Sequence, residues 1–309
     1  MIVIERLKSI TNGGLHLTDC VVGDDEFVRI IRLIPTFSLE WLKLTDVKLD
    51  PDAGFELAKA VYHSRTIYRL NIGANNFSDD QVHAFIVSTM NGVVKLFTIK
   101  DYKMNDLNIE LLRQTLMNRE CNLCSLSLPN CNLGKGLGSI FTALPYTKLQ
   151  TIELDNIGMS DKDVIGLSSI LNQTKIKYLY LTNNNITDIG VKSLSNVIRN
   201  SNILVGIGLT HNKGVTNQSV EYLKTAIKCH PSMRYIDLDN TGVSLSDEQR
   251  LRRILVVLYS SKSKLMTVLC SIKTITRIGK KCKLRVLPIE LFRKIADTLY
   301  VEKKYTLSS

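Results

Sequence analysis

The sequence predicts an α/β solenoid of about nine strand, turn and helix units. Within residues 176–200, apolar residues first alternate and then recur every three or four positions, which indicates a strand followed by a helix. The same pattern returns along the chain at a nearly fixed interval. A single unit of this kind cannot bury its apolar face, so neighbouring units are expected to stack.

The most complete copy of the unit follows the order L-x-x-L-x-L-x-x-N-x-L. Its residues are Ile176, Leu179, Leu181, Asn184 and Ile186. The position of Asn184 serves as a marker, and its equivalents recur every 26 to 29 residues. The nine markers are Cys20, Val47, Asn75, Tyr102, Cys131, Ile157, Asn184, Asn212 and Thr241. An Asn or Cys there is expected to satisfy buried backbone groups of the turn.

This motif, with its period of about 28 residues, resembles the ribonuclease-inhibitor class of leucine-rich repeats over about residues 10–260. The resemblance implies a horseshoe with parallel strands inside and helices outside. Apolar spacing marks the helices independently, and many start near Asp, Asn or Ser, which can cap free amides. The expected helices are residues 52–64, 79–90, 108–117, 161–171, 188–199, 217–228 and 246–259.

Three parts are predicted along the chain: an N-terminal cap in residues 1–12, a leucine-rich-repeat domain in residues 13–260, and a basic helical region in residues 261–309. Residues 251–309 hold 14 Lys and Arg against 3 Asp and Glu. Subtracting these from the totals of 40 and 29 leaves 26 of each before residue 251. The repeat array is therefore neutral, and the C-terminal part holds the whole net charge of +11.

The sequence favours a cytoplasmic protein. Its N-terminus, MIVIERLKSITNGG, has no apolar core of a secretory signal, and no apolar run is long enough to span a bilayer. Seven cysteines at irregular positions argue against a disulfide scaffold. Cys121 and Cys124 form a C-x-x-C pair, but with no second pair they are expected to be buried thiols rather than zinc ligands.

No pattern typical of an enzyme is present. The five histidines lie on different units without a partner at motif spacing, and neither a phosphate-binding P-loop nor a zinc-protease motif occurs. Gly134, Gly136 and Gly138 are interpreted as a turn into a helix rather than as a nucleotide site. We therefore expect no catalytic residue, cofactor or metal, and no small-molecule substrate.

Side chains between the buried leucines of each strand should share one surface, here called the strand face, on the inner side of the horseshoe. Exposed aromatic residues on such a surface often anchor protein interfaces, and their truncation commonly costs about 2 kcal/mol or more. The predicted partner-binding residues are Trp41, Lys43, Arg69, Glu153, Asp155, Tyr178, Tyr180, Tyr235, Asp237 and Asp239. The tyrosines and carboxylates favour a protein partner with a basic segment, bound by a monomer. In the alternative interpretation, the tyrosines only pack along the strands.

The C-terminal region allows two interpretations. Its basic run GKKCKLR lacks interleaved aromatic residues, which favours a solvated helix face over a nucleic-acid or acidic-membrane patch. The following segment, LPIELFRKIADTL, is similar to the first helix of an F-box, as found truncated in the poxviral PRANC family. This resemblance implies binding of a Skp1-type adaptor through Leu287, Pro288, Glu290, Leu291, Ile295 and Leu299. A Pro-initiated helix that closes the solenoid explains the same residues.

Non-enzymatic protein recognition is the predicted function. Richness in Ile, Asn and Lys together with irregular repeats resembles leucine-rich-repeat effectors of intracellular bacteria, which implies type IV secretion into the host cytosol. The tail VEKKYTLSS is the candidate delivery signal. Two alternatives are an F-box-like adaptor that recruits a target to a host cullin ubiquitin ligase, and a Ran-type GTPase-activating protein. The latter family has an acidic tail, whereas this tail is basic.

Overall fold

A computed structural model of the protein was analysed. It describes residues 13–22, 28, 31–32, 34–36, 38–73, 77–200, 203–229 and 232–258. The predicted cap in residues 1–12 and the predicted basic region in residues 261–309 lie outside these residues. The chain separates into two compact units, Met1–Glu248 and Gln249–Ser309. The predicted repeats fall mainly within the first unit, whose described residues carry the sheet.

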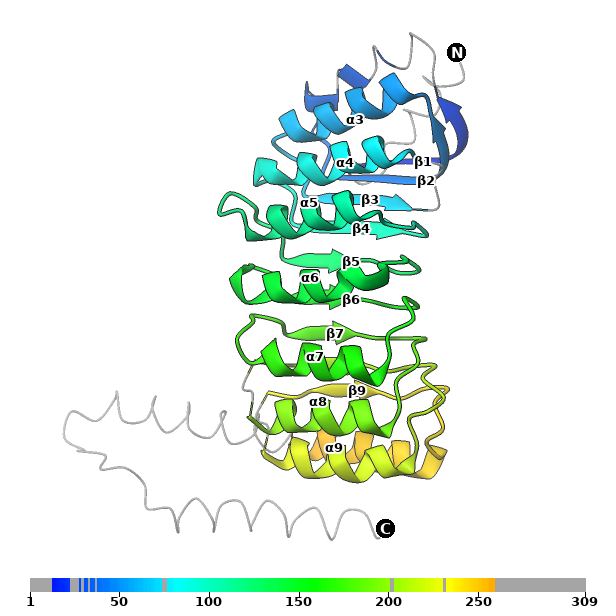
Figure 1. Ribbon diagram of the computed structural model, residues 1–309, viewed down its shortest axis with the longest axis vertical. Helices are drawn as coiled ribbons and strands as arrows, with labels where there is room; N and C mark the ends of the chain where they lie inside the picture. Colours follow the sequence, from blue (N-terminus) through cyan, green and yellow to red (C-terminus); the bar gives the residue numbers. More distant parts are fainter. Residues whose placement is uncertain are drawn as a thin grey trace, which may run out of the picture. The chain divides into compact units, whose positions relative to one another are not determined.

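Nine parallel strands form one sheet, in which each strand pairs with the next along the chain (Figure 1). They are β1 (Gly14–Val22), β2 (Trp41–Leu49), β3 (Arg69–Gly73), β4 (Leu96–Lys100), β5 (Ser125–Ser127), β6 (Thr151–Glu153), β7 (Tyr178–Tyr180), β8 (Gly206–Gly208) and β9 (Tyr235–Asp237). The register aligns Ile152 with Leu179, and Leu179 with Ile207. Equivalent residues of the motif therefore lie side by side, and the predicted stack of nine strands is confirmed.

Helices connect the strands and lie together on one side of the sheet (Figure 1). They are α3 (Pro51–His63), α4 (Asp79–Ser88), α5 (Asp106–Met117), α6 (Leu137–Ala143), α7 (Asp161–Leu171), α8 (Asp188–Asn200) and α9 (Asn217–Cys229). Short 3-10 turns are η1 (Ile34–Thr36), η2 (Thr89–Asn91), η3 (Gly134–Gly136) and η4 (Leu144–Tyr146). Residues 245–258 are also helical. Within the described part of the chain, no helix has the length and apolarity needed to cross a membrane.

The helices start where polar caps were expected. Asp50 accepts a hydrogen bond from the Asp52 amide at the start of α3. Ser78 and Gln81 form a reciprocal capping box at the start of α4. All seven expected helices are present, and the turn into a helix expected at Gly134, Gly136 and Gly138 is confirmed by η3 and α6, although no bounds were predicted for α6. Only seven residues long and preceded by a glycine-rich 3-10 turn, α6 is too short to display a helical period.

The apolar core lies between the sheet and the helices. Leu179 and Leu181, from β7 and the turn after it, are fully buried. Val191, Leu194 and Ile198 of α8 are also fully buried, because helical spacing places them on one face. Replacing Leu181 by a charged residue would remove the stabilisation that comes from burying a leucine side chain. It would also leave an unpaired ion inside the stack.

Asn184 joins two neighbouring units through its side chain. Its Oδ1 accepts hydrogen bonds from the amides of Ile157 (3.2 Å) and Met159 (2.9 Å) in the preceding unit. Its Nδ2 donates to the carbonyls of Leu154 (2.8 Å) and Leu181 (3.0 Å). The side chain is buried, and the bonds with Met159, Leu154 and Leu181 satisfy backbone groups inside the stack.

Asn212 repeats this arrangement one unit later. Its Oδ1 accepts from the amides of Asn184 and Ile186, both at 3.2 Å. Its Nδ2 donates to the carbonyls of Leu181 (2.9 Å) and Leu209 (2.8 Å). The structural role predicted for the two asparagines is therefore confirmed, whereas Asn75 lies outside the described residues.

Aspartates at the starts of helices form a second link between units. Asp188, at the start of α8, accepts from the Thr216 amide (2.9 Å) and the Thr216 hydroxyl (2.6 Å) of the next unit. Asp161 accepts from the amide and hydroxyl of Thr187 in the same way, at 2.8 and 2.6 Å. Burial acts to raise the pKa of Asp188, but the bonds from Ser219 and Thr216 hold it below its ordinary value.

Replacement of Asn184 by Ala should strongly destabilise the repeat domain. The change leaves several buried backbone groups unpaired, at about 1–3 kcal/mol for each group that water cannot reach. We expect urea-induced unfolding to show a loss of about 3 kcal/mol or more. The neighbouring Asn185 is exposed, so Asn185→Ala should change the unfolding free energy by about 0.5 kcal/mol at most. Equal losses for the two variants would contradict the assigned role of Asn184.

Candidate protein-binding face

The strand face consists of the strand side chains that point away from the helices. Tyr178 and Tyr180 lie on it, because the residue between them, Leu179, is buried in the core. Strand alternation and register place the ten predicted partner-binding residues on this face or directly after its strands. Arg69 and Asp239 are exposed, and the other eight are half-buried.

These ten residues form two separate groups. Trp41 pairs with Arg69 across β2 and β3, close to Lys43 on β2. The tyrosines and carboxylates belong to β6, β7 and β9 and to the turns after β6 and β9. Strands β4 and β5 lie between the two groups. Only the second group combines several aromatic rings with several carboxylates.

Tyr178, Tyr180 and Tyr235 form a stacked set, here called the tyrosine cluster. The ring centroids of Tyr178 and Tyr235 are 6.3 Å apart, with an interplanar angle of 20°. Those of Tyr180 and Tyr235 are 6.5 Å apart, at 30°. The Tyr235 hydroxyl also donates to the Tyr180 hydroxyl at 2.5 Å. Burial, with this hydrogen bond, raises the pKa of Tyr235 above its usual range, so the Tyr235 hydroxyl keeps its proton near neutral pH.

Two glycines of β8 make room for the cluster, and the sequence interpretation missed them. The cluster residues come from β7 and β9, with β8 between them. A Cβ at Gly206 would lie 2.2 Å from Tyr235 Cε1, and one at Gly208 would lie 3.0 Å from Tyr180 Cδ1. The rings thus cover a strand whose own positions on the strand face carry no side chain. The signal available in the sequence was GIG at the strand position, one unit after YLY.

Carboxylates border the cluster on the side of β6. Glu153 accepts from the Ser127 hydroxyl at 2.7 Å, and Asp155 accepts from the Thr182 amide at 2.7 Å. Burial raises the pKa of Asp155 to about 6, and the negative charge of Glu153 adds to the rise. Asp155 therefore changes its charge close to neutral pH.

A second set of carboxylates follows the tyrosines on β9. Asp237, Asp239 and Glu248 each bring a carboxylate oxygen within 4.8 Å of the other two. Sequence reasoning missed Glu248, because it lies in the helical residues 245–258 rather than on a strand. Three carboxylates suit a hard cation by donor type but fall short of the six to eight oxygen ligands that Ca²⁺ takes. The set makes this end of the strand face acidic.

Other polar groups do not converge on a reaction centre within the described part of the chain. His16, His63, His83 and His211 belong to β1, α3, α4 and the turn after β8. Cys121, Cys124 and Cys131 are free thiols. Burial raises the pKa of Cys121, and raises that of Cys131 to about 11, so both stay protonated near neutral pH.

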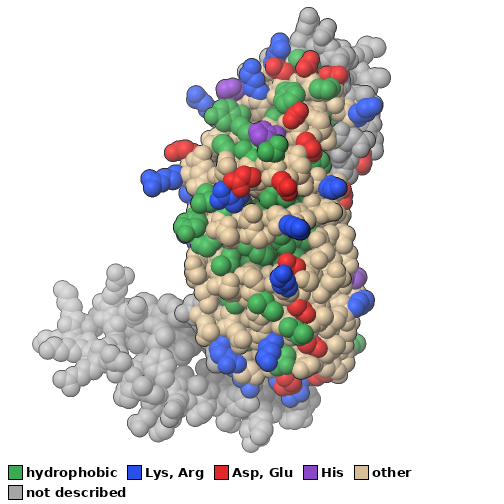
Figure 2. All heavy atoms as spheres, viewed as in Figure 1, with side chains coloured by type: hydrophobic (Ala, Val, Ile, Leu, Met, Phe, Trp, Pro, Cys, Tyr) green, Lys and Arg blue, Asp and Glu red, His purple; other side chains and the backbone are tan. Residues whose placement is uncertain are grey.

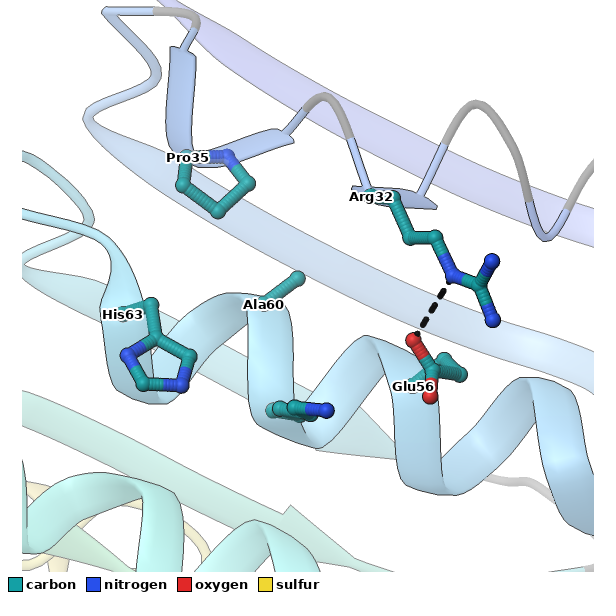
Figure 3. Close-up of a pocket in the computed structure, with 6 residues that line it drawn as sticks. Arg32, Pro35, Glu56, Ala60 and His63 are labelled. Carbon is teal, nitrogen blue, oxygen red and sulfur yellow. Dashed lines mark hydrogen bonds and ion pairs between the residues drawn. The ribbon is translucent and has the colours of Figure 1, made fainter.

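Two hollows occur away from the tyrosine cluster. One, of about 220 Å³, is lined by residues of α3, by Pro35 of η1 and by Arg32, whose Nε lies 3.1 Å from Glu56 Oε2 (Figure 3). It is smaller than usual small-molecule sites, which measure about 300–1,000 Å³. The other, of about 480 Å³, lies over the turns after β6, β7 and β8 and is lined by Asn183, His211 and Lys213 among others.

Comparisons with known proteins agree with this architecture. A family model described as Leucine Rich repeat matches residues 172–195. The human NACHT, LRR and PYD domains-containing protein 14 is 23% identical over 197 residues, covering 61% of this chain and 18% of that protein. The human NACHT, LRR and PYD domains-containing protein 5 is 27% identical over 168 residues, covering 53% and 14%. The chain thus spans less than a fifth of the length of these curated relatives.

Two solved structures align with this chain at low identity. The leiomodin-1 actin-binding site 2 aligns with a TM-score of 0.46 and 14% identity, covering 52% of this chain and 95% of that chain. The structure of Rad7 and Elc1 in yeast aligns with a TM-score of 0.40 and 16% identity, covering 72% and 75%. The fold is a leucine-rich-repeat solenoid. Domains with this fold typically act as non-catalytic binding modules.

Replacing Asp155 by Asn should stabilise the protein above pH 7 but not at pH 4. A carboxyl group with a raised folded-state pKa contributes stability below its unfolded value of about 3.9 and loses it as pH rises through about 6. Asn keeps the acceptor for the Thr182 amide and carries no charge to desolvate. Partial exposure screens the effect, so we expect about 1 kcal/mol at most.

Thermal unfolding of both proteins at pH 4.0 and pH 7.5 measures the effect of Asp155→Asn. The expected gain in Tm appears only at pH 7.5. A gain in Tm of the same size at both pH values would show that the gain does not come from removing the charge of the Asp155 carboxylate.

Proposed function

We propose that the protein is a non-catalytic binding module that captures a protein partner through the strand face, with the tyrosine cluster at the centre of the contact. The observation that carries this proposal is the set of three stacked rings bordered on both sides by carboxylates. Rings held in this way present a large contact area, and little side-chain entropy remains to be lost on binding.

The carboxylates favour a partner segment that contains arginine. A guanidinium group can stack on a tyrosine face and at the same time bond to a carboxylate in a bidentate manner. Carboxylates lie on the β6 side of the cluster in Glu153 and Asp155, and on the β9 side in Asp237 and Asp239. Lysine lacks the planar fork, so an Arg segment should bind more tightly than a Lys segment.

The alternative interpretation gives the tyrosines a packing role only, because they cover Gly206 and Gly208. Their half-buried state fits both interpretations. Binding differs from packing in one measurable respect: a packing role predicts a loss of stability without a loss of affinity. The test therefore has to measure stability and affinity separately.

The double change Tyr180→Ala with Asp237→Ala should weaken binding of an Arg-containing peptide. As probe we suggest a fluorescein-labelled peptide of alternating Arg and Gly, with a Glu and Gly peptide as the negative control. Loss of an aromatic anchor with its charged neighbour should raise Kd at least tenfold. Fluorescence anisotropy at pH 7.5 measures this, and binding should weaken at pH 5.0, where Asp155 is protonated.

Two further variants make this test sharper. Gly206→Ala displaces Tyr235 without removing any ring or charge, so it should also weaken binding. Thr98→Ala changes a half-buried residue of β4 on the same face, outside the cluster, and should leave Kd unchanged. Retained affinity in the Tyr180→Ala, Asp237→Ala protein, with a normal unfolding profile, would reject the proposal.

Finer roles of the chain remain predictions. Delivery into a host cell and binding of a Skp1-type adaptor through residues 287–299 both depend on residues outside the described part of the chain. The same holds for the tail VEKKYTLSS. A Ran-type GTPase-activating role would require a catalytic contribution that no feature described above supports.

A further inference from the structure

The two edges of the repeat array differ in their acidic residues, whereas exposed cations occur at both. One edge consists of the helix C-terminal ends and the loops that lead from each helix to the next strand. It carries seven exposed cations from six consecutive helix-to-strand connections and is here called the basic edge. They are Arg65, Lys95, Arg119, Lys148, Lys175, Lys177 and Arg199. These loops contain a single carboxylate near the cations, Glu120. The opposite edge, where the strands lead into the helices, is rich in Asp.

None of the seven cations forms an ion pair with a residue that the structure describes. Two of them are nevertheless held in place by neutral groups. Lys148 Nζ donates to the Arg119 carbonyl (2.9 Å) and to Asn122 Oδ1 (2.6 Å), and Lys177 Nζ donates to Gln150 Oε1 (2.9 Å). The basic edge thus presents positioned charge without neutralising partners.

Helix dipoles explain only part of this arrangement. A cation in the last turn of a helix is favourable, as for Arg199 in α8, but the effect falls off within that turn. Lys175 and Lys177 follow the end of α7 by four and six residues, and Lys95 follows the end of η2 by four. These three cations lie next to strand starts, where no helix end requires them.

A row of large apolar side chains accompanies the cations. Tyr62, Met90, Met117 and Tyr146 each stand 20 residues after the aligned strand residues Leu42, Leu70, Phe97 and Leu126. They therefore occupy equivalent positions in four consecutive units. Tyr146 is 71% exposed, Tyr62 44% and Met117 39%. Figure 2 shows hydrophobic side chains reaching the surface between Lys and Arg side chains on the helix side.

We propose that the basic edge binds single-stranded nucleic acid. Phosphates would contact Arg119, Lys148 and Lys175, and a base would stack on the exposed ring of Tyr146. Neighbouring units bring these cations about 5 Å apart at the strands and about 10 Å apart at the helices, which suits a chain with one negative charge per step. Stacking on an aromatic ring beside a line of cations is the usual mode of binding without sequence preference.

An anionic membrane is a less suitable ligand than single-stranded nucleic acid for the basic edge and its row of apolar side chains. Interfacial binding buries apolar side chains about 5–10 Å into the headgroup region. Tyr62 and Met117 are each less than half exposed, so they offer little apolar surface for such insertion. An acidic peptide would satisfy the cations but would leave the exposed Tyr146 ring without a stacking partner. The proposal is independent of the tyrosine cluster, which lies on the strand face.

The test compares two triple variants of the full chain that lose the same charge at opposite edges. The edge variant is Arg119→Gln, Lys148→Gln and Lys175→Gln, and the control is Lys103→Gln, Lys162→Gln and Lys213→Gln, all exposed residues. Both keep the basic residues after position 250, so background binding there cancels. The probe is a fluorescein-labelled oligonucleotide of twelve thymidines, followed by anisotropy, with unfolding midpoints as the check on folding.

We expect the edge variant to weaken binding about tenfold or more and the control to stay within about twofold of the wild type. In a plot of log K against log salt concentration, the slope of the edge variant should be less steep by about 2. Each phosphate contact to a single strand contributes about 0.7 to the slope, and the variant removes three cations. Equal weakening in both triple variants would overturn the proposal, as would failure of the wild type to bind the oligonucleotide.

Tyr146 distinguishes nucleic acid from other anions. Tyr146→Ala should weaken oligonucleotide binding about tenfold, whereas Tyr146→Phe, which retains the ring, should bind as the wild type does. Parallel probes are a peptide of twelve glutamates and vesicles of phosphatidylserine and phosphatidylcholine. If either of these binds as tightly as the oligonucleotide, and Tyr146→Ala has no effect, the edge recognises an acidic protein or a membrane and the proposal fails.

Discussion

Hydrogen bonding between neighbouring units is the constraint on which this structure depends. Each strand bonds to the strands beside it, and at Asn184 and Asn212 the turn amides of one unit bond to the asparagine of the next. Because these groups are buried, the period of the sequence cannot drift by more than a residue or two. The regular spacing also places equivalent side chains of successive units in rows. A partner can therefore contact several such side chains at once.

Two such rows differ in origin. The tyrosine cluster arises where β7 and β9 lie on either side of a strand with no side chains on that face. The basic edge arises at loops, where each unit contributes its own cation. Helix orientation contributes to this difference, because α3, α4, α5, α7 and α8 each place an acidic residue in the first turn, as with Asp161 and Asp188. A chain of neutral repeats can therefore gather its carboxylates at one edge and leave cations with few acidic neighbours at the other.

The sequence alone was sufficient for the strand register and for seven helices, because both follow from the spacing of apolar residues. It also identified Asn184 and Asn212 as structural residues. It indicated a turn into a helix at the glycines before α6 but not the bounds of that helix, which is shorter than two helical periods would require. Nor did it reveal the pairing of Tyr180 with Tyr235, which lie 55 residues apart and meet only because the intervening strand has glycine at the facing positions.

The glycines of β8 also affect how this surface can change as the sequence diverges. A side chain at Gly206 would occupy the space of the Tyr235 ring, so neither residue can be replaced by a larger one alone. Gly208 is tied to Tyr180 in the same way. Related chains should therefore keep the glycines and tyrosines together or lose them together. Such covariation would link Tyr180 and Tyr235, which lie two strands apart, as well as each tyrosine with its glycine on the adjacent strand. It would indicate that the residues of the cluster are conserved together.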